Sequence, residues 1–236
     1  MAAALYRYCS SFLGFAEASG WVTASLLPRK GLRTIAPAVA PRQRVVSDAE
    51  LVAIWNASAE LELKPRVFTR LLVLMAAREM QVADIAAGEV DLDLAQWIIP
   101  APRTKHKKAA LTLPLSQLAL TELTAVWPAM TVPSPFKLLR IRGFSKLKAK
   151  LDEASGVRDW RFHDLRRSAR SAMTRLGVPR EHAELAIGHI SHQSALERVY
   201  DRHDYSGEIR IASLTWQAHV ERLVTEGTVG KVIALG

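Results

Sequence analysis

Apolar residues recur at helical spacing along most of this chain, and this pattern limits the possible folds more than any other feature. Ser47-Asp48-Ala49-Glu50 is a capping box ahead of one apolar helix, and Ser116 caps another. Only two stretches, Gln96–Pro100 and Leu111–Leu113, have strand character, and a basic loop joins them. The sequence therefore predicts a mainly α fold with a small antiparallel β-sheet, an α+β domain.

Prolines and glycines divide the predicted helices. Pro65 suits the start of a helix that runs through Met75, and Arg78 is expected at the end of that apolar helix. Further helices are expected at residues 82–87, at 117–126, around Arg166, at 181–187 and at 209–223. The last of these has one apolar face, which predicts that it docks on the domain.

The N-terminal 45 residues differ from the rest. Residues 2–19 have an amphipathic helical pattern closed by Gly20, and residues 27–44 are rich in proline and basic residues, as in a linker. A domain boundary is therefore predicted near residue 45. Residues 1–45 are expected to hold one helix and this linker, and residues 46–236 a globular domain with a C-terminal helix and tail.

The charge balance favours a polyanionic partner. The 236-residue chain has 32 Lys+Arg against 23 Asp+Glu, a net charge of +9, and 49% hydrophobic residues that support a real core. Basic residues cluster in two runs, Arg103–Lys108 and Lys137–Lys150. Charge runs are often no more than solvated faces, but two of them beside candidate phosphate chemistry favour DNA or RNA as the partner.

The N-terminus and the single cysteine indicate the compartment. Cys9 has no partner for an intramolecular disulfide, and polar residues interrupt the N-terminal apolar stretch. No stretch reaches the length of a membrane span. A cytoplasmic protein, or in a eukaryote a nuclear one, that does not insert into a membrane is expected.

Phosphate chemistry is indicated by His163 and Arg166. Their spacing places both side chains on one face of a helix. The guanidinium fork of arginine matches phosphate oxygens, and a neighbouring imidazole can bind the same group or move a proton. A basic helix with a chance H-x-x-R is the alternative interpretation of the motif by itself.

The His163–Arg166 motif is part of a longer series of polar residues along the chain. In chain order these are Arg78, Lys105 in the basic loop, His163, Arg166, Gly188-His189 and Tyr200. In this order the chain resembles the tyrosine recombinase (phage integrase) family, and its prophage-type members in particular. The resemblance covers roughly residues 46–223 and is most specific from Phe162 to Tyr205.

The resemblance implies a site-specific recombinase that acts on double-stranded DNA as a tetramer. Arg78 and Arg166 would grip the scissile phosphate, and Tyr200 would attack it to form a 3′-phosphotyrosyl link. Lys105 would protonate the leaving 5′-oxygen and His163 would move the proton of the nucleophile. His189 would hydrogen-bond the phosphate. No cofactor and no metal are expected, because the cations supply the charge.

The chain departs from the family pattern at three places. Gln81 stands where the family usually has an acid, and Met75-Ala76 replaces the usual Thr-Gly pair. Only about one helix of the usual N-terminal core-binding domain is present, so an N-terminally truncated integrase is expected. A catalytically impaired DNA-binding remnant and a type IB topoisomerase-like enzyme are the alternatives.

Overall fold

A computed structural model describes residues 2–23, 42–105, 107, 109–129, 131–133, 135–189 and 203–233. It divides into two units, residues 1–43 and 44–236. In the first, α1 (Ala2–Ala18) is followed by a turn at Gly20, where φ is +71°, as the sequence predicts. The ring of Trp21 packs edge-on against Phe15. Most of the predicted linker lies outside the described residues.

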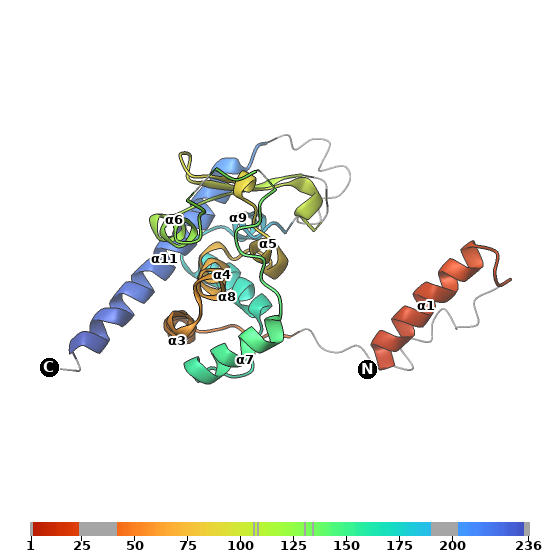
Figure 1. The fold of residues 1–236 in the computed structure, drawn as a ribbon, viewed down its shortest axis with the longest axis horizontal. Helices are drawn as coiled ribbons and strands as arrows, with labels where there is room; N and C mark the ends of the chain where they lie inside the picture. The colour runs from red at the N-terminus through yellow and green to blue at the C-terminus, as the bar shows by residue number, and fades with distance from the viewer. Residues whose placement is uncertain are drawn as a thin grey trace. The chain divides into compact units, whose positions relative to one another are not determined.

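The second unit is mainly helical (Figure 1). Its α-helices among the described residues are α3 (Asp48–Ala57), α4 (Leu63–Met75), α5 (Glu79–Ala83), α6 (Gln117–Thr124), α7 (Phe144–Ser155), α8 (Phe162–Arg175), α9 (Arg180–Ala186) and α11 (Ser206–Ile233). The long α11 packs against α9, α3, α4 and α8. In the part of the chain that is described, no helix is long and apolar enough to cross a membrane.

The predicted hairpin is confirmed and belongs to a three-stranded antiparallel sheet of the described residues. Strand β2 (Gln96–Ile99) lies between β1 (Val90–Asp91) and β3 (Leu111–Pro114), and Trp97 is paired with Leu113. Strand β1 was not predicted, because a two-residue strand leaves no alternation in the sequence. The 3-10 helix η3 (Ala101–Arg103) follows β2 and begins the basic loop. The α+β expectation is therefore confirmed.

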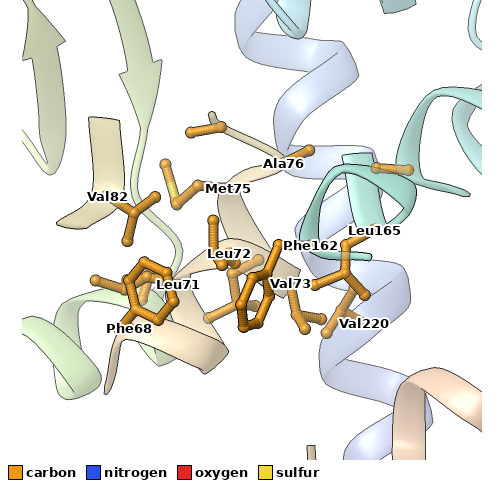
Figure 2. Close-up of a cluster of buried hydrophobic side chains, with 14 of the residues drawn as sticks. Phe68, Leu71, Leu72, Val73, Met75, Ala76, Val82, Phe162, Leu165 and Val220 are labelled. Carbon is orange, nitrogen blue, oxygen red and sulfur yellow. The ribbon is translucent and has the colours of Figure 1, made fainter. Parts of the chain in front are cut away.

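Helix α4 forms the centre of the core. Phe68, Leu71 and Leu74 are almost completely buried, and Figure 2 shows Phe162 and Leu165 of α8 beside this helix. A helix that is apolar on nearly every side must be covered on nearly every side, which explains its central position. Each such side chain contributes about 1.5–3 kcal/mol of burial free energy.

Local signals placed some helix ends correctly. At the start of α3, the Ser47 N–H donates to Glu50 Oε2 at 2.8 Å and Glu50 N–H donates to Ser47 Oγ at 3.3 Å, so the capping box is present. The docking face of α11 is also confirmed, with Ala212, Trp216 and Val220 buried. This helix continues ten residues beyond the expected end at residue 223.

The prediction around Arg78 was wrong in detail. Helix α4 ends at Met75, Ala76 adopts a left-handed conformation (φ +47°), and Arg78 is the N-cap residue of α5. The helix expected at residues 82–87 begins instead at Glu79. The reason is the chain reversal at Ala76, which no residue pattern announced because alanine is uncommon in left-handed backbone.

Candidate active site

Arg78 is held by the turn between α4 and α5. Its main-chain N–H donates to Gln81 Oε1 at 2.9 Å, and its guanidinium Nη2 donates to the carbonyl oxygen of Gly188 at 3.1 Å. Partial burial lowers the pKa of Arg78 from its ordinary value. The side chain thus connects α5 to the end of α9.

Arg166 lies one turn into α8 and is only 3% exposed. Its Nη1 donates to the carbonyl oxygen of Ala76 at 2.8 Å, and its Nη2 donates to that of Ile187. Burial, and after it the charge of Arg78, lowers the pKa of Arg166 to about 9, so the guanidinium remains charged at neutral pH. Its Nε is buried and has no hydrogen-bond partner among the described residues.

The two arginines meet at the end of α9 without a balancing carboxylate. Arg166 binds the carbonyl of Ile187 and Arg78 binds the next one, of Gly188. No described carboxylate forms an ion pair with either, and Glu184 acts on Arg166 only through space. Because buried charge without a counterion is costly, this arrangement suits an external anion.

Gly188 allows the end of α9 to approach the Leu111 side chain of β3 closely. Its φ is +61°, and a Cβ there would lie 2.8 Å from Cδ2 of Leu111. A side chain at this position would strain the backbone and would displace the Leu111 side chain of β3. The two carbonyls that orient the arginines therefore depend on glycine.

His163 lies in the first turn of α8, three residues before Arg166, as the sequence predicts. Partial burial lowers its pKa, and the charges of Arg167 and Arg166 lower it further. The imidazole is therefore neutral at pH 7 and able to accept a proton.

His189 directly follows Gly188. Its Nδ1 lies 2.8 Å from Oε2 of Glu184, and Oε1 of Glu184 accepts from Nε of Arg170 at 2.5 Å. Burial is the largest cause that lowers the pKa of His189, Arg166 and Arg78 lower it as well, and Glu184 opposes them. His189 thus joins the two arginines at one end of α9.

Lys105 is exposed in the connection between β2 and β3. The structure does not bring its ammonium into contact with the arginines. It does bring the base of the loop to Arg78, because Gln81 Nε2 donates to the carbonyl of Arg103 at 3.2 Å and Arg103 Nη2 donates to that of Gln81 at 2.7 Å. Tyr200, the expected nucleophile, lies outside the described residues.

Comparison with known proteins identifies the family. The family model described as "Phage integrase family" matches residues 44–206. This chain belongs to the phage integrase family. The resemblance that the polar residues indicated is therefore confirmed at the level of the family.

Individual relatives of this integrase-family chain agree with that assignment. Prophage integrase IntA of Escherichia coli (strain K12) is 27% identical over 177 residues, which is 73% of this chain. The match covers 42% of that protein, so the chain spans less than half the length of this curated relative.

Solved structures share the fold. The integrase from mycobacterium phage Brujita (TM-score 0.52, 17% identity) is matched over 92% of this chain and 70% of that one. The XerA recombinase (TM-score 0.52, 16% identity) is matched over 86% and 72%. At these identities the likeness concerns the fold alone.

The departure at Gln81 has a structural role in this integrase-family domain. Gln81 is 3% exposed and uses both ends of its amide, accepting from the Arg78 N–H and donating to the carbonyl of Arg103. A carboxylate could supply only the accepting end. The amide therefore ties the main chain of Arg78 to the loop that carries Lys105.

Sequence reasoning missed the residues that support the site. Glu184, five residues before His189, contacts its imidazole, and Arg170 on α8 holds Glu184 in turn. The sequence shows the departure at Ala76, but no pattern in it predicts the contact between the Ala76 carbonyl and Arg166. The only signal for these roles was the Gly188-His189 pair, which indicates a chain reversal after a helix.

Proposed function

We propose that this chain cleaves and rejoins DNA strands at a specific site through a covalent 3′-phosphotyrosyl intermediate. The observation that carries the proposal is the pair of arginines, Arg78 and Arg166, which converge at the end of α9 without an ion-paired carboxylate among the described residues. A phosphodiester supplies the missing negative charge. Membership of the phage integrase family supports DNA recombination as the process.

The arginines retain the hydrogen-bonding capacity that this function needs. A guanidinium has five N–H donors, and Arg166 uses its two Nη atoms on main-chain carbonyls while its buried Nε–H remains unpartnered among the described residues. Donors that are already oriented and desolvated stabilise the charge that builds up on the phosphate in the transition state.

The remaining residues complete a balanced reaction. The phenolic proton of Tyr200 passes to the neutral His163, and the phenolate oxygen bonds to phosphorus. The bond from phosphorus to the 5′-oxygen breaks, and Lys105 protonates that oxygen. Religation reverses each step, so no external energy source is consumed. His189 donates a hydrogen bond to the phosphate.

Part of the basic surface is available for the DNA backbone. In the run from 137 to 150, Arg142 pairs with Asp84, and Lys148 pairs with Asp152 and covers the ring of Trp160. Arg140, Lys146 and Lys150 are exposed. These exposed cations supply the salt-dependent, sequence-independent part of DNA affinity. We further propose assembly as a tetramer on DNA.

Covalent trapping tests the proposal. Nicked duplexes with randomised sequence around the nick are incubated with the chain, and the protein–DNA adduct is isolated and mapped. We expect an adduct at Tyr200, its loss in Tyr200→Phe with DNA binding retained, and an unchanged adduct in the matched variant Tyr205→Phe. Sequencing of the trapped DNA then defines the site.

Other outcomes would replace the proposal. Binding without any adduct would indicate a DNA-binding protein, and relaxation of supercoiled plasmid without sequence preference would indicate a topoisomerase. An adduct at Tyr205 would show that the nucleophile is assigned wrongly.

A further inference from the structure

Helix α9 ends in a chain reversal that places His189 over the preceding turn. The Gly188 N–H donates to the carbonyl of Leu185 at 2.7 Å, and the His189 N–H donates to that of Glu184 at 2.8 Å. These are the two hydrogen bonds of a Schellman motif, with Gly188 in the left-handed position. The motif brings the imidazole back along the helix to the Glu184 side chain.

Glu184 is itself held from a second direction. Its Oε1 accepts from Nε of Arg170 on α8, while its Oε2 lies 2.8 Å from Nδ1 of His189. The hydrogen bonds from His189 and Arg170 lower the pKa of Glu184 against the opposing effect of burial. An ionised carboxylate only accepts hydrogen bonds, so Nδ1 of His189 must carry a proton.

We propose that Glu184 is a positioning residue, which holds His189 with Nδ1 protonated so that only Nε2 is available to the DNA phosphate. The inference deepens the proposed function and rests on it. No hydrogen bond joins Nε2 to any described residue. With Nδ1 already protonated, Nε2 must gain a proton before it can donate to a phosphate oxygen, and Glu184 stabilises the imidazolium that results.

Phosphate binding and proton uptake at His189 are thus linked. In the unbound site, Arg166 of α8 and Arg78 of the α5 N-cap oppose protonation, and Glu184 of α9 favours it. His163 of α8 is also close enough for its charge and that of His189 to oppose each other. On α11, the carboxylate of Glu208 is paired with His203. A phosphate between the arginines offsets their charge and so favours the charged form of His189.

Nuclear magnetic resonance of the imidazole nitrogens tests the inference in the free protein. The His189 signals are assigned by their loss in His189→Asn. We expect the Nδ1–H tautomer at neutral pH in the wild type. In Glu184→Gln we expect His189 to titrate at lower pH, because the carboxylate that favours the charged form has gone.

A matched variant separates this local effect from the general loss of negative charge. Glu181→Gln removes the same charge from an exposed position on α9 and should leave the titration of His189 unchanged. Arg170→Met, which removes the second partner of Glu184, should loosen the carboxylate and weaken the tautomer preference. An Nε2–H tautomer in the wild type, or equal titration of His189 in wild type and Glu184→Gln, would overturn the inference.

Adduct formation provides the functional measurement. Groups that orient metal-binding histidines contribute roughly 10- to 100-fold to activity, and we expect a loss of that order in Glu184→Gln. The loss should grow as pH rises, whereas Glu181→Gln should behave as the wild type. A loss in Glu184→Gln that is the same at every pH would indicate a merely structural role and overturn the inference.

The two proposals fail in different ways. If the wild type forms no adduct while the nitrogen signals behave as expected, the proposed function is wrong and the Glu184–His189 arrangement stands. If the adduct forms but the tautomer and titration do not respond to Glu184, the function stands and the positioning role is wrong.

Discussion

The guanidinium of Arg166 donates a hydrogen bond to the main-chain carbonyl of Ala76, with Nη1 and the oxygen 2.8 Å apart. Ala76 is also the left-handed residue that ends α4 and allows the chain to turn toward Arg78. One backbone position therefore orients both arginines of the candidate site. A change in the conformation of Ala76 is expected to affect both together.

Ala76→Gly is expected to leave the stability of the domain nearly unchanged. Left-handed backbone costs an L-residue with a Cβ about 1–2 kcal/mol, and the greater entropy of glycine in the unfolded chain offsets about 0.4–1 kcal/mol of that gain. Ala76 is only 1% exposed, and the loss of its buried methyl group costs about 0.8 kcal/mol more. We therefore expect the free energy of unfolding, measured with urea, to change by less than about 1 kcal/mol. The neighbouring Ala77 is buried as well but does not have a positive φ, so Ala77→Gly relieves no strain and should destabilise the domain by about 1–2 kcal/mol. Equal effects of the two variants would contradict the account of Ala76.

Arg166→Lys is expected to fail as a conservative replacement. A single ammonium cannot reproduce a planar fork that binds the carbonyls of Ala76 and Ile187 at the same time. The rate of adduct formation should fall by about 10²- to 10³-fold, the usual scale for loss of a transition-state donor. Arg175→Lys, at the exposed end of α8, is the matched control. A near wild-type rate for Arg166→Lys would show that the buried guanidinium does not contact the phosphate.

Lys105→Ala is expected to slow cleavage by about 10²-fold or more, the scale of a lost acid catalyst. The exposed ammonium on a tethered loop can reach a leaving oxygen, because the base of the loop is held beside Arg78 through Gln81 and Arg103. A substrate with sulfur in place of the 5′-oxygen needs no proton and should restore much of the rate. Lys107→Ala is the control, and a sulfur substrate that restores Lys107→Ala but not Lys105→Ala would move the role to Lys107.

The stability of the domain is expected to fall with pH below about 6.5, the ordinary pKa of histidine in an unfolded chain. Burial lowers the pKa of both His163 and His189 in the folded protein, so in this range the unfolded state binds more protons than the folded state. The stability that the two neutral histidines contribute is therefore fully present above pH 6.5, and it is lost as pH falls from there through their pKa values in the folded protein.

Thermal unfolding at pH 7.5 and 5.5 measures this effect. The double variant His163→Asn, His189→Asn should lose much of the difference in Tm between these two pH values. The lowered pKa values of Asp48 and Glu184 act at more acidic pH, below the ordinary range of carboxylates, and do not interfere. An unchanged pH dependence in the double variant would show that neither histidine is linked to folding.

The sequence by itself determined the features that neighbouring residues encode. The capping box at Ser47 and Glu50 and the apolar face of α11 are local patterns, since the residues that make them are close in the chain. The pairing of β2 with β3 also followed from two short apolar runs and the loop between them. The order of six polar residues indicates the family before any geometry is known: Arg78, Lys105, His163, Arg166, His189 and Tyr200.

Only the tertiary structure decided how those residues are held. Arg166 meets Ala76 across 90 residues of sequence, and Arg78 meets Gly188 across 110. Such contacts depend on how α8 and α9 pack against the end of α4, and packing is the sum of many weak apolar contacts that no short pattern records. The same packing buries Arg166 and partly buries Arg78 without an ion-paired carboxylate among the described residues, and this imbalance of charge favours an anion at the site.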